Sequence, residues 1–578
     1  MTRAVTTNSS RRGLLLFSVA ALAAGLVYLN ALNNPFVYDD YRTVLANGSI
    51  VRLGDLRSIV GYDMTRPIVN LSFAIDRAVW GLQPFGFHLT SVLLHMLNVV
   101  LLFLVARRLT ADMNARARTQ QTALNADLVA FAAAALFAVH PMMTEAVGYI
   151  SSRSDVLCAT GFLASFLCAR RWMIGGGVGW WLLATGTWLI ALLSKEVAGT
   201  LPFVLLIYDA LFLDGDRAAR RRRLLRLHAP LLVAAIGAGV TRIAVFLVVE
   251  HPGSAAIQWR AILDDISVAG RYLMMLAVPS GQAVFHDVAW SVSATGGIAA
   301  VLALVAAAWA LRRRSPLASF GAWWFLLLLV PSALLVIFNQ GELMAEHRAY
   351  LASAGVFLMV AVAVAALVAS SARATGRVPW LVMTVLAAAL LPLAARTLLR
   401  NAIWADPVTL WREAADRSPR SALPRVVLGE SLHEAQRHAE AISAYRDALR
   451  LQPDDDMGYF KLAVCLAELR RFDDAADALE GLRRVHPDST RVSTGLGVVA
   501  MMAGKTEAAR RHFHDAIGLD ARDIMARQWL AVLEEDVARN FAEALRICEE
   551  IQRIVPGDLG NDDCIRRNRA RIAAAGSR

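Results

Sequence analysis

The stretch Asn34-Pro35-Phe36-Val37-Tyr38-Asp39-Asp40-Tyr41-Arg42 directly follows an apolar run from Leu14 to Leu32. That run is long enough to cross a bilayer as a helix. Two adjacent carboxylates are therefore expected at the mouth of an uncleaved first membrane helix. An ionised side chain at that depth is costly unless it has a partner or a function. A solvated loop that merely ends the helix is the plain alternative, and the rest of the chain decides between the two.

Composition places the chain among polytopic membrane proteins. It has 578 residues, of which 57% are hydrophobic, and a mean hydropathy of +0.46; soluble proteins are closer to roughly 45–50% apolar. The net charge of +11 would be compatible with nucleic-acid binding. Its distribution argues against one, because the arginines lie in short loops between apolar runs, as in cytoplasmic loops of membrane proteins. The main clusters are Arg107-Arg108, Arg170-Arg171, Arg217 to Arg226 and Arg312-Arg313-Arg314.

If the arginine-rich loops are cytoplasmic and the chain changes side at each apolar run, the sequence predicts about eleven membrane-spanning helices. They are expected near 13–33, 88–106, 127–139, 155–169, 178–194, 197–213, 229–249, 294–311, 317–338, 349–369 and 378–397. The segment 261–278 carries Asp264, Asp265 and Arg271, so we expect it to lie on the outer face as an interfacial helix. An odd count places the N-terminus in the cytoplasm and everything from about Asn401 on the opposite side.

The remainder of the chain has a different pattern. From Trp404 onward no apolar run reaches membrane length, and a self-similarity of about 34 residues appears. Expected repeats lie near 422–455, 456–489, 490–523 and 524–557, carried by Leu428-Gly429, Ala441, Tyr445, Leu462-Ala463, Ala475, Leu496-Gly497, Ala509 and Phe513. This spacing is typical of tetratricopeptide repeats, whose solenoids offer a concave groove for extended peptide. The fold class predicted is all-α, with a membrane domain at 1–400 and a repeat domain at 401–578.

The five cysteines give no metal-binding motif. Cys158 and Cys168 lie in an apolar run and are expected as small packing residues. Cys465, Cys548 and Cys564 fall on the side predicted to be oxidising. Neither CxxC nor a His/Cys zinc spacing is present, so a structural metal is not expected. Cys548 and Cys564 are candidates to pair, although two free buried thiols are the favoured interpretation.

Mixed-charge motifs occur in the loops predicted to face outward. Each alone has an ordinary explanation, such as a helix cap, a snorkelling lysine or a local ion pair. Together they are hard to dismiss, because the cytoplasmic loops hold little besides arginine. The chemistry is therefore predicted on the outer face. The residues concerned are Asp39, Asp40, Arg66, His140, Glu145, Arg153, Asp155, Lys195, Glu196, Asp287, Glu346, His347 and Arg348.

These residue types suit glycosyl transfer from a lipid carrier. A carboxylate can deprotonate a hydroxyl that attacks an activated sugar carbon. Arginine, lysine and histidine can hold a departing phosphate, and apolar helices can bind a lipid tail. The sequence shows no Gly-rich phosphate loop, no Ser/His/Asp order and no nucleotide fingerprint.

An ordered set of motifs, covering nearly the whole chain, resembles a known family. The set is Val37-Tyr38-Asp39-Asp40, Arg66-Pro67, Gly86-Phe87-His88-Leu89, Leu93-Leu94-His95, Phe137-Ala138-Val139-His140-Pro141, Thr144-Glu145-Ala146-Val147, Ser152-Arg153-Ser154-Asp155, Leu193-Ser194-Lys195-Glu196 and the stretch from Glu346 to Ser353. It is similar to the transmembrane and tetratricopeptide-repeat-containing proteins, O-mannosyltransferase-like enzymes of the GT-C fold. Two departures stand out: Ala352 where the family often has proline, and Met142-Met143 where a small or histidine-bearing pair is usual.

The resemblance implies a polyprenyl-phosphate-linked sugar donor, mannose or similar, and transfer to a protein hydroxyl on the periplasmic or lumenal face. Asp40 is then the first choice for the base and Asp39 the second. Arg348, with His347, Lys195 and Arg66, is expected to bind the phosphate. His140, Glu145, Arg153, Asp155, Glu196, Glu346 and Asp287 are expected to line the cavity.

The expected partners are the lipid-linked donor, membrane lipid, and a protein or peptide acceptor held by the repeats. No cofactor is required by the sequence, and a divalent metal is left open. The expected location is a bacterial inner membrane with periplasmic repeats, or an endoplasmic reticulum membrane with lumenal repeats if the source is eukaryotic. The alternative function is a non-catalytic, membrane-anchored scaffold that uses its repeats to assemble envelope proteins.

Overall fold

The computed structural model describes residues 2–116, 123–250, 259–288, 292–336, 342–375, 380–555 and 558–576. Within these ranges the regular elements are helices, apart from one isolated β-bridge. The chain divides into two compact units. The first is Met1–Asp40 with Leu53–Ala405, and the second is Tyr41–Arg52 with Asp406–Arg578.

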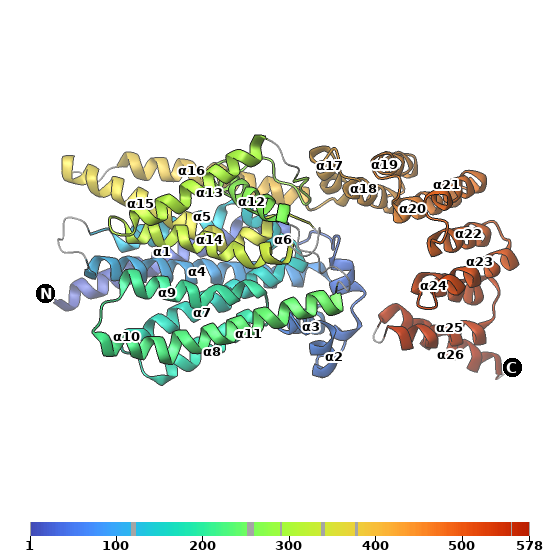
Figure 1. Ribbon diagram of the computed structural model, residues 1–578, viewed down its shortest axis with the longest axis horizontal. Coiled ribbons are helices and arrows are strands. Elements are labelled where there is room, and N and C mark those ends of the chain that lie inside the picture. The colour runs from blue at the N-terminus through green and yellow to red at the C-terminus, as the bar shows by residue number, and fades with distance from the viewer. Residues whose placement is uncertain are drawn as a thin grey trace. The chain divides into compact units, whose positions relative to one another are not determined.

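The first unit is a bundle of helices (Figure 1). Each of the eleven apolar stretches identified in the sequence is mostly helical over its described residues, and so is the amphipathic stretch at 261–278. The elements are α1 Thr2–Val27, α2 Leu56–Tyr62, α3 Pro67–Trp80, α4 Pro84–Arg116, α5 Ala126–Val139, α6 Thr144–Gly148, α7 Arg153–Met173, α8 Val178–Leu192, α9 Leu201–Phe212, α10 Arg217–Arg223, α11 Ala229–Val245, α12 Trp259–Ala277, α13 Val292–Leu311, α14 Pro316–Val336, α15 Tyr350–Thr375 and α16 Trp380–Ile403.

Fewer of these helices are long enough to cross a membrane than the eleven expected. By length and composition seven qualify among the described residues, or eight if α5 and the following Pro141–Gly148 segment count as one span bent by 59°. The bend falls where Pro141 interrupts the helix, as proline does. α8 and the Thr295–Leu311 part of α13 are apolar but shorter, and α9 has only 12 residues. Apolar composition predicted where the long helices lie, but not their lengths, and it did not predict α2, α3 or α10.

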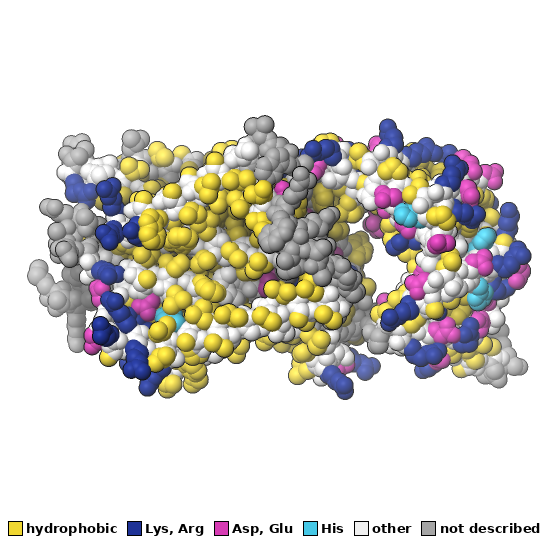
Figure 2. Space-filling model, in the orientation of Figure 1, with side chains coloured by type: hydrophobic (Ala, Val, Ile, Leu, Met, Phe, Trp, Pro, Cys, Tyr) yellow, Lys and Arg dark blue, Asp and Glu magenta, His cyan; other side chains and the backbone are white. Residues whose placement is uncertain are grey.

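Small residues set the closest helix contacts in this unit. A Cβ on Gly355 of α15 would lie 2.2 Å from the carbonyl oxygen of Gly321 on α14, and one on Gly270 of α12 would lie equally close to Gly297 of α13. Such contacts let backbones approach without a side chain between them, as in membrane helix pairs. Figure 2 shows a wide hydrophobic surface on this unit, with Lys and Arg gathered at the end where α10 lies. The chain is thus an integral membrane protein with multiple apolar helices.

The second unit is a helical repeat. After α17 (Pro407–Arg417), helix pairs begin at residues 423, 456, 490 and 524, close to the expected period. Gly429 and Gly497 lie under aromatic rings, since a Cβ would come within 2.6 Å of Tyr445 and 2.5 Å of Phe513. The helices are α18 Leu423–Glu434, α19 His438–Leu451, α20 Asp456–Glu468, α21 Phe472–Val485, α22 Thr490–Met502, α23 Thr506–Leu519, α24 Ile524–Val532, α25 Phe541–Ile554 and α26 Leu559–Gly576. Residues 556–557, at the end of the fourth expected repeat, lie outside the described residues.

Two features of this unit differ from expectation. Cys548 of α25 and Cys564 of α26 form a disulfide, where free thiols were favoured. Both cysteines face the same apolar cluster, so packing of the last helices brings them together. The segment Tyr41–Arg52 also belongs to this unit although the sequence placed it in the membrane domain, and its Asn47 pairs with Asp558 in an antiparallel bridge.

Candidate active site

A polar cavity of about 300 Å³ opens in the first unit. Six of the residues expected at the site line it, namely Asp39, Arg66, Lys195, Glu196, His347 and Arg348. The rest of the wall is Tyr149, Ser151, Ser152, Ser154, Phe246, Ser332 and Glu342. The residues that line the cavity come from segments up to about 300 positions apart in the chain. The apolar periodicity of a sequence does not predict that such segments meet.

Asp40, the first choice for the base, does not line this cavity. It is buried, and its carboxylate accepts hydrogen bonds from the Val37 N–H at 3.1 Å and from the Ser151 N–H and hydroxyl at 2.8 and 2.6 Å. Burial raises the pKa of Asp40 to about 7, although these hydrogen bonds favour the ionised form. The geometry is that of a side chain that fixes a turn.

Asp39 occupies the cavity wall because of that turn. Tyr38 has a φ of 52°, in the left-handed region that a side chain other than glycine rarely adopts. The N–H of Asp39 donates to the Tyr149 hydroxyl at 3.1 Å, and the Tyr149 ring stacks on Trp404 with centroids 5.6 Å apart. The Asp39 carboxylate is thereby held at the cavity on a backbone fixed from both sides.

Two of the cations are paired. Lys195 Nζ lies 2.6 Å from the Asp155 carboxylate, and both residues are buried. An Arg66 guanidinium nitrogen lies 3.5 Å from the Glu196 carboxylate. Burial alone would raise the pKa of Glu196, but the charges of Arg66 and Lys195 lower it to about 2. Lys195, Arg66 and Glu196 line the wall, and together with Asp155 behind it they form a charge-balanced group.

Arg348 differs from the other two cations. Its guanidinium donates to the backbone carbonyls of Glu342 at 2.8 Å and Leu343 at 3.4 Å. Among the residues that the structure describes, no carboxylate forms an ion pair with Arg348. Burial, helped by the charge of Glu145, raises the pKa of Glu342 to about 8. Near neutral pH, the cavity therefore has an uncompensated guanidinium next to a mostly protonated acid.

Glu145 and Glu346 lie behind the wall. Glu145 accepts from the N–H of Glu346 at 2.8 Å and pairs with His347 Nδ1 at 2.6 Å. Glu346, itself buried, accepts from the Ala283 N–H at 2.8 Å and lies 3.1 Å from His286 Nε2. Both carboxylates were expected in the cavity. Their contacts instead fix His347 and the chain around Ala283.

The remaining expected residues also lie away from the cavity wall. Arg153 is fully buried, with its guanidinium 2.6 Å from Asp76 and over the Phe73 ring. His140 is buried, and its Nε2 lies 3.1 Å from the Leu276 carbonyl oxygen. Asp155 reaches the cavity only through its pairing with Lys195. Asp287 is half-buried and is not part of the lining.

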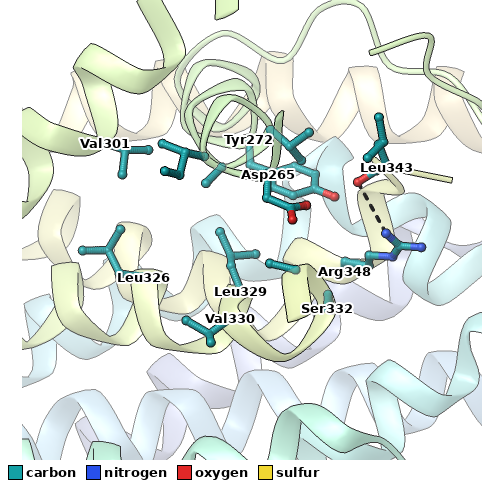
Figure 3. Close-up of a pocket in the computed structure, with 13 residues that line it drawn as sticks. Asp265, Tyr272, Val301, Leu326, Leu329, Val330, Ser332, Leu343 and Arg348 are labelled. Atoms are coloured by element: carbon teal, nitrogen blue, oxygen red, sulfur yellow. Dashed lines mark hydrogen bonds between the residues drawn. The ribbon is translucent and has the colours of Figure 1, made fainter. Parts of the chain in front are cut away.

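An apolar cavity of about 180 Å³ adjoins the polar one. It lies among α12, α13 and α14, and Figure 3 shows Val301 and Leu326 toward one end and Arg348 at the other. Ser332 and Arg348 line both cavities. Burial raises the pKa of Asp265, in its wall, to about 7, although the Arg348 charge opposes the shift. Arg348 thus stands at the junction of a polar and an apolar space.

Sequence reasoning missed part of both walls. Tyr149 and Ser332 carried no signal, since one is a single tyrosine between motifs and the other lies in an apolar helix. Asp265 gave a usable signal, because a charged residue in an otherwise apolar stretch requires a partner or a function. Among the residues that the structure describes, three or more metal-ligand atoms do not converge at this cavity.

Comparisons with known proteins agree with this organisation. Two family models described as tetratricopeptide repeat match residues 393–456 and 432–497. The chain is 36% identical over 190 residues to "Protein O-mannosyl-transferase Tmtc1" of Drosophila melanogaster, which covers 31% of this chain and 20% of the relative. It is 25% identical over 573 residues to Tmtc3 of the same fly, covering 84% of this chain and 60% of the relative.

Human TMTC1, also named a protein O-mannosyl-transferase, is 32% identical over 240 residues, with 36% of this chain and 26% of the relative covered. The chain thus spans about a fifth of the length of Tmtc1 and three-fifths of Tmtc3. Both parts of the chain, a set of apolar helices and a helical repeat, are covered by the Tmtc3 match. The chain is thus similar to the TMTC proteins, which combine a transmembrane region with tetratricopeptide repeats.

Proposed function

We propose that the chain is a membrane glycosyltransferase that moves a sugar, mannose or similar, from a polyprenyl-phosphate carrier to a protein hydroxyl. The observation that carries this proposal is the pair of adjoining cavities, one polar and one apolar, which share Arg348 and Ser332. A lipid-linked sugar has the same division into a polar head and an apolar tail, joined at a phosphate. The relatives' printed names support the same activity.

In this proposal Arg348 binds the carrier phosphate. A guanidinium recognises phosphate by two parallel hydrogen bonds, and this one has no carboxylate paired with it among the described residues. The first isoprene units lie along Leu326, Leu329 and Val301. Glu342, mostly protonated near neutral pH, donates a hydrogen bond to the head group rather than repelling it. Lys195 also lines the polar cavity, where its charge is balanced by Asp155.

The proposed chemistry is a displacement at the anomeric carbon. The acceptor hydroxyl oxygen forms a bond to that carbon while the bond from the carbon to the phosphate oxygen breaks. The hydroxyl proton passes to the Asp39 carboxylate, and the electron pair of the broken bond leaves on polyprenyl phosphate. Asp39 is our choice for the base over Asp40, because its carboxylate is at the cavity and that of Asp40 is occupied by three donors.

We place this membrane unit in the GT-C class, with the eleven helical segments arranged so that the N-terminus is cytoplasmic and the repeats are on the catalytic side. The arginines gathered at the α10 end of the unit support this orientation. The repeats would recruit the acceptor protein. A surface groove of about 590 Å³ on α19, α20 and α21, lined by Ile442, Tyr459 and Leu462 among others, suits an extended peptide.

The test is transfer from a purified polyprenyl-phosphate sugar to an extract of envelope proteins by the full chain in detergent. We expect transfer by the wild type and by Asp214→Asn, a control carboxylate that is exposed and pairs with Arg116. Asp39→Asn should lose transfer while its melting temperature is unchanged. Wild-type transfer by Asp39→Asn and Arg348→Ala would reject the proposal and favour the non-catalytic scaffold.

A further inference from the structure

Three side chains that can bind a metal converge in the repeat unit, far along the chain from the residues of the proposed active site. They are His433 in the last turn of α18, His438 at the start of α19 and Cys465 on α20. Their ligand atoms all lie within 4.8 Å of one another, and Cys465 Sγ is 3.9 Å from His438 Nδ1. Cys465 is fully buried and the two histidines are half-buried.

The hydrogen bonds around the cluster orient both imidazoles. His433 Nε2 lies 3.3 Å from the Glu468 carboxylate, and His438 Nε2 lies 3.1 Å from the Gln436 side-chain oxygen. With the proton on Nε2, each imidazole keeps a lone pair on Nδ1, and the Nδ1 of His438 lies 3.9 Å from the Cys465 thiol, which can donate to it. A metal-binding histidine characteristically has its second nitrogen held in this way by a carboxylate or an amide oxygen.

The Nδ1 of His433 supplies an independent observation. It is buried and has no hydrogen-bond partner in the part of the chain that the structure describes. A buried polar atom without a partner costs roughly the desolvation of the group, so such atoms are rare and call for an explanation. A metal ion bound among His433, His438 and Cys465 would satisfy this nitrogen.

We propose that His433, His438 and Cys465 form a site for a transition-metal ion of the zinc type, with water as the fourth ligand. Zn²⁺ takes sulfur at about 2.3 Å and nitrogen at about 2.0–2.1 Å in tetrahedral sites, which sets the ligand atoms about 3.3–3.6 Å apart. The 3.9 Å separation of Cys465 and His438 is close to this value. No two ligand atoms are more than 4.8 Å apart, so any pair has to close by at most about 1 Å, which side-chain rotation can supply.

The site would join the first two helix pairs of the solenoid. His433 and His438 flank the turn between α18 and α19, and Cys465 belongs to the next pair. A bound ion would lock this turn against α20. A role as small packing residues is the alternative for these side chains, but it does not account for the orientation of both imidazoles. The spacing, four residues between the histidines and 26 more before the cysteine, matches no common zinc motif, so sequence motifs do not predict this site.

The thiol has to lose its proton when the metal binds. Metal binding therefore releases a proton, and the apparent affinity should rise with pH. A thiolate-to-metal absorption band, rather than this pH dependence, distinguishes a thiolate ligand from a site made by the two histidines alone, because a histidine also has to be deprotonated to bind.

The test is titration of the chelator-treated full chain in detergent with Co²⁺, a visible-absorbing probe for tetrahedral zinc sites. We expect one equivalent to bind and give a thiolate-to-metal absorption band. Cys465→Ala should lose that band. Loss of a residue that only hydrogen-bonds to a metal ligand weakens metal binding by roughly 10–100-fold, and His438→Ala, which removes a ligand itself, should weaken it by more. Glu468→Gln, which alters such a hydrogen-bonding residue, should fall within that range.

Two control variants match these substitutions. Cys168→Ala removes a half-buried cysteine of the membrane unit, and His512→Ala removes a histidine of α23. Both should bind Co²⁺ like the wild type. Melting of each metal-free variant checks that it folds. If the wild type shows no thiolate band at one equivalent, or if folded Cys465→Ala and His438→Ala keep wild-type affinity, the site does not exist.

Discussion

The same chemical change at the two adjacent carboxylates Asp39 and Asp40 should affect different properties of the protein. Replacing either with asparagine keeps the shape of the side chain and removes its charge. Asp39 lines the polar cavity, whereas Asp40 is buried and accepts three hydrogen bonds. Asp39→Asn is therefore expected to alter the rate of transfer, and Asp40→Asn to alter the stability of the fold.

The size of each effect follows from its cause. Loss of a proton-transfer group lowers the rate by roughly 10²–10⁴-fold, which is about 2.7–5.4 kcal/mol of activation free energy. For Asp40, burial moves the pKa from 3.8 to about 7, a difference of about 3 units or about 4 kcal/mol. The folded chain binds this proton more tightly than the unfolded chain. The free energy of unfolding should therefore fall as the pH rises from about 4 to about 7, and then level off.

The assay follows melting temperature and transfer in parallel at several pH values for the wild type and both variants. Asn at position 40 cannot titrate. As the pH rises, the wild type should therefore lose stability relative to Asp40→Asn. Asp39→Asn should follow the wild-type melting curve at every pH. If the melting temperatures of the wild type and Asp40→Asn depend on pH in the same way, Asp40 is not the buried titrating group that fixes the turn. A melting temperature for Asp39→Asn that drops with its activity would refute a purely chemical role for that residue.

Four further results are expected. Arg348→Ala should raise the apparent KM for the lipid-linked donor more than it lowers kcat, with Arg220→Ala on α10 as the control; an unchanged KM would remove Arg348 from the phosphate site. The same KM should rise above about pH 8 as Glu342 ionises, and Glu342→Gln should abolish that rise; a rise that persists in the variant would have another cause. Arg153→Ala should destabilise the fold by about 3–5 kcal/mol, because it leaves Asp76 buried and unpaired; a melting temperature like that of the wild type would contradict this. A reporter active only outside the cytoplasm, fused after Arg578, should be active, and activity of a cytoplasmic reporter there would overturn the orientation.

The elements of the fold were largely predictable because each depends on local sequence. Apolar runs predicted the long helices of the membrane unit but not α2, α3 or α10, and the small and aromatic positions of the repeats, such as Gly429 and Tyr445, predicted the solenoid pairs. Helix length was less predictable. Pro141 ends α5 after 14 residues, and the chain continues at an angle of 59°. No period in the sequence reports such a bend.

The roles of the polar residues depend on contacts between distant segments. Asp39 and Asp40 are neighbours, yet the left-handed Tyr38 and the position of Ser151 direct one to the cavity and the other away from it. Arg153 looked like a cavity residue because its partner, Asp76, lies 77 positions earlier. Six of the residues in the sequence motifs line one polar cavity. The motifs did not predict which residues line it and which hold its wall.

The most direct test of the proposed glycosyl transfer is the intact mass of envelope proteins in the organism that carries this chain. Cells with the wild-type chain, cells without it and cells with Asp39→Asn should be compared at equal levels of the protein. We predict that at least one envelope protein carries the added mass of a hexose only with the wild-type chain, and loses it equally in the other two. Envelope proteins of unchanged mass in all three strains would contradict the proposed activity.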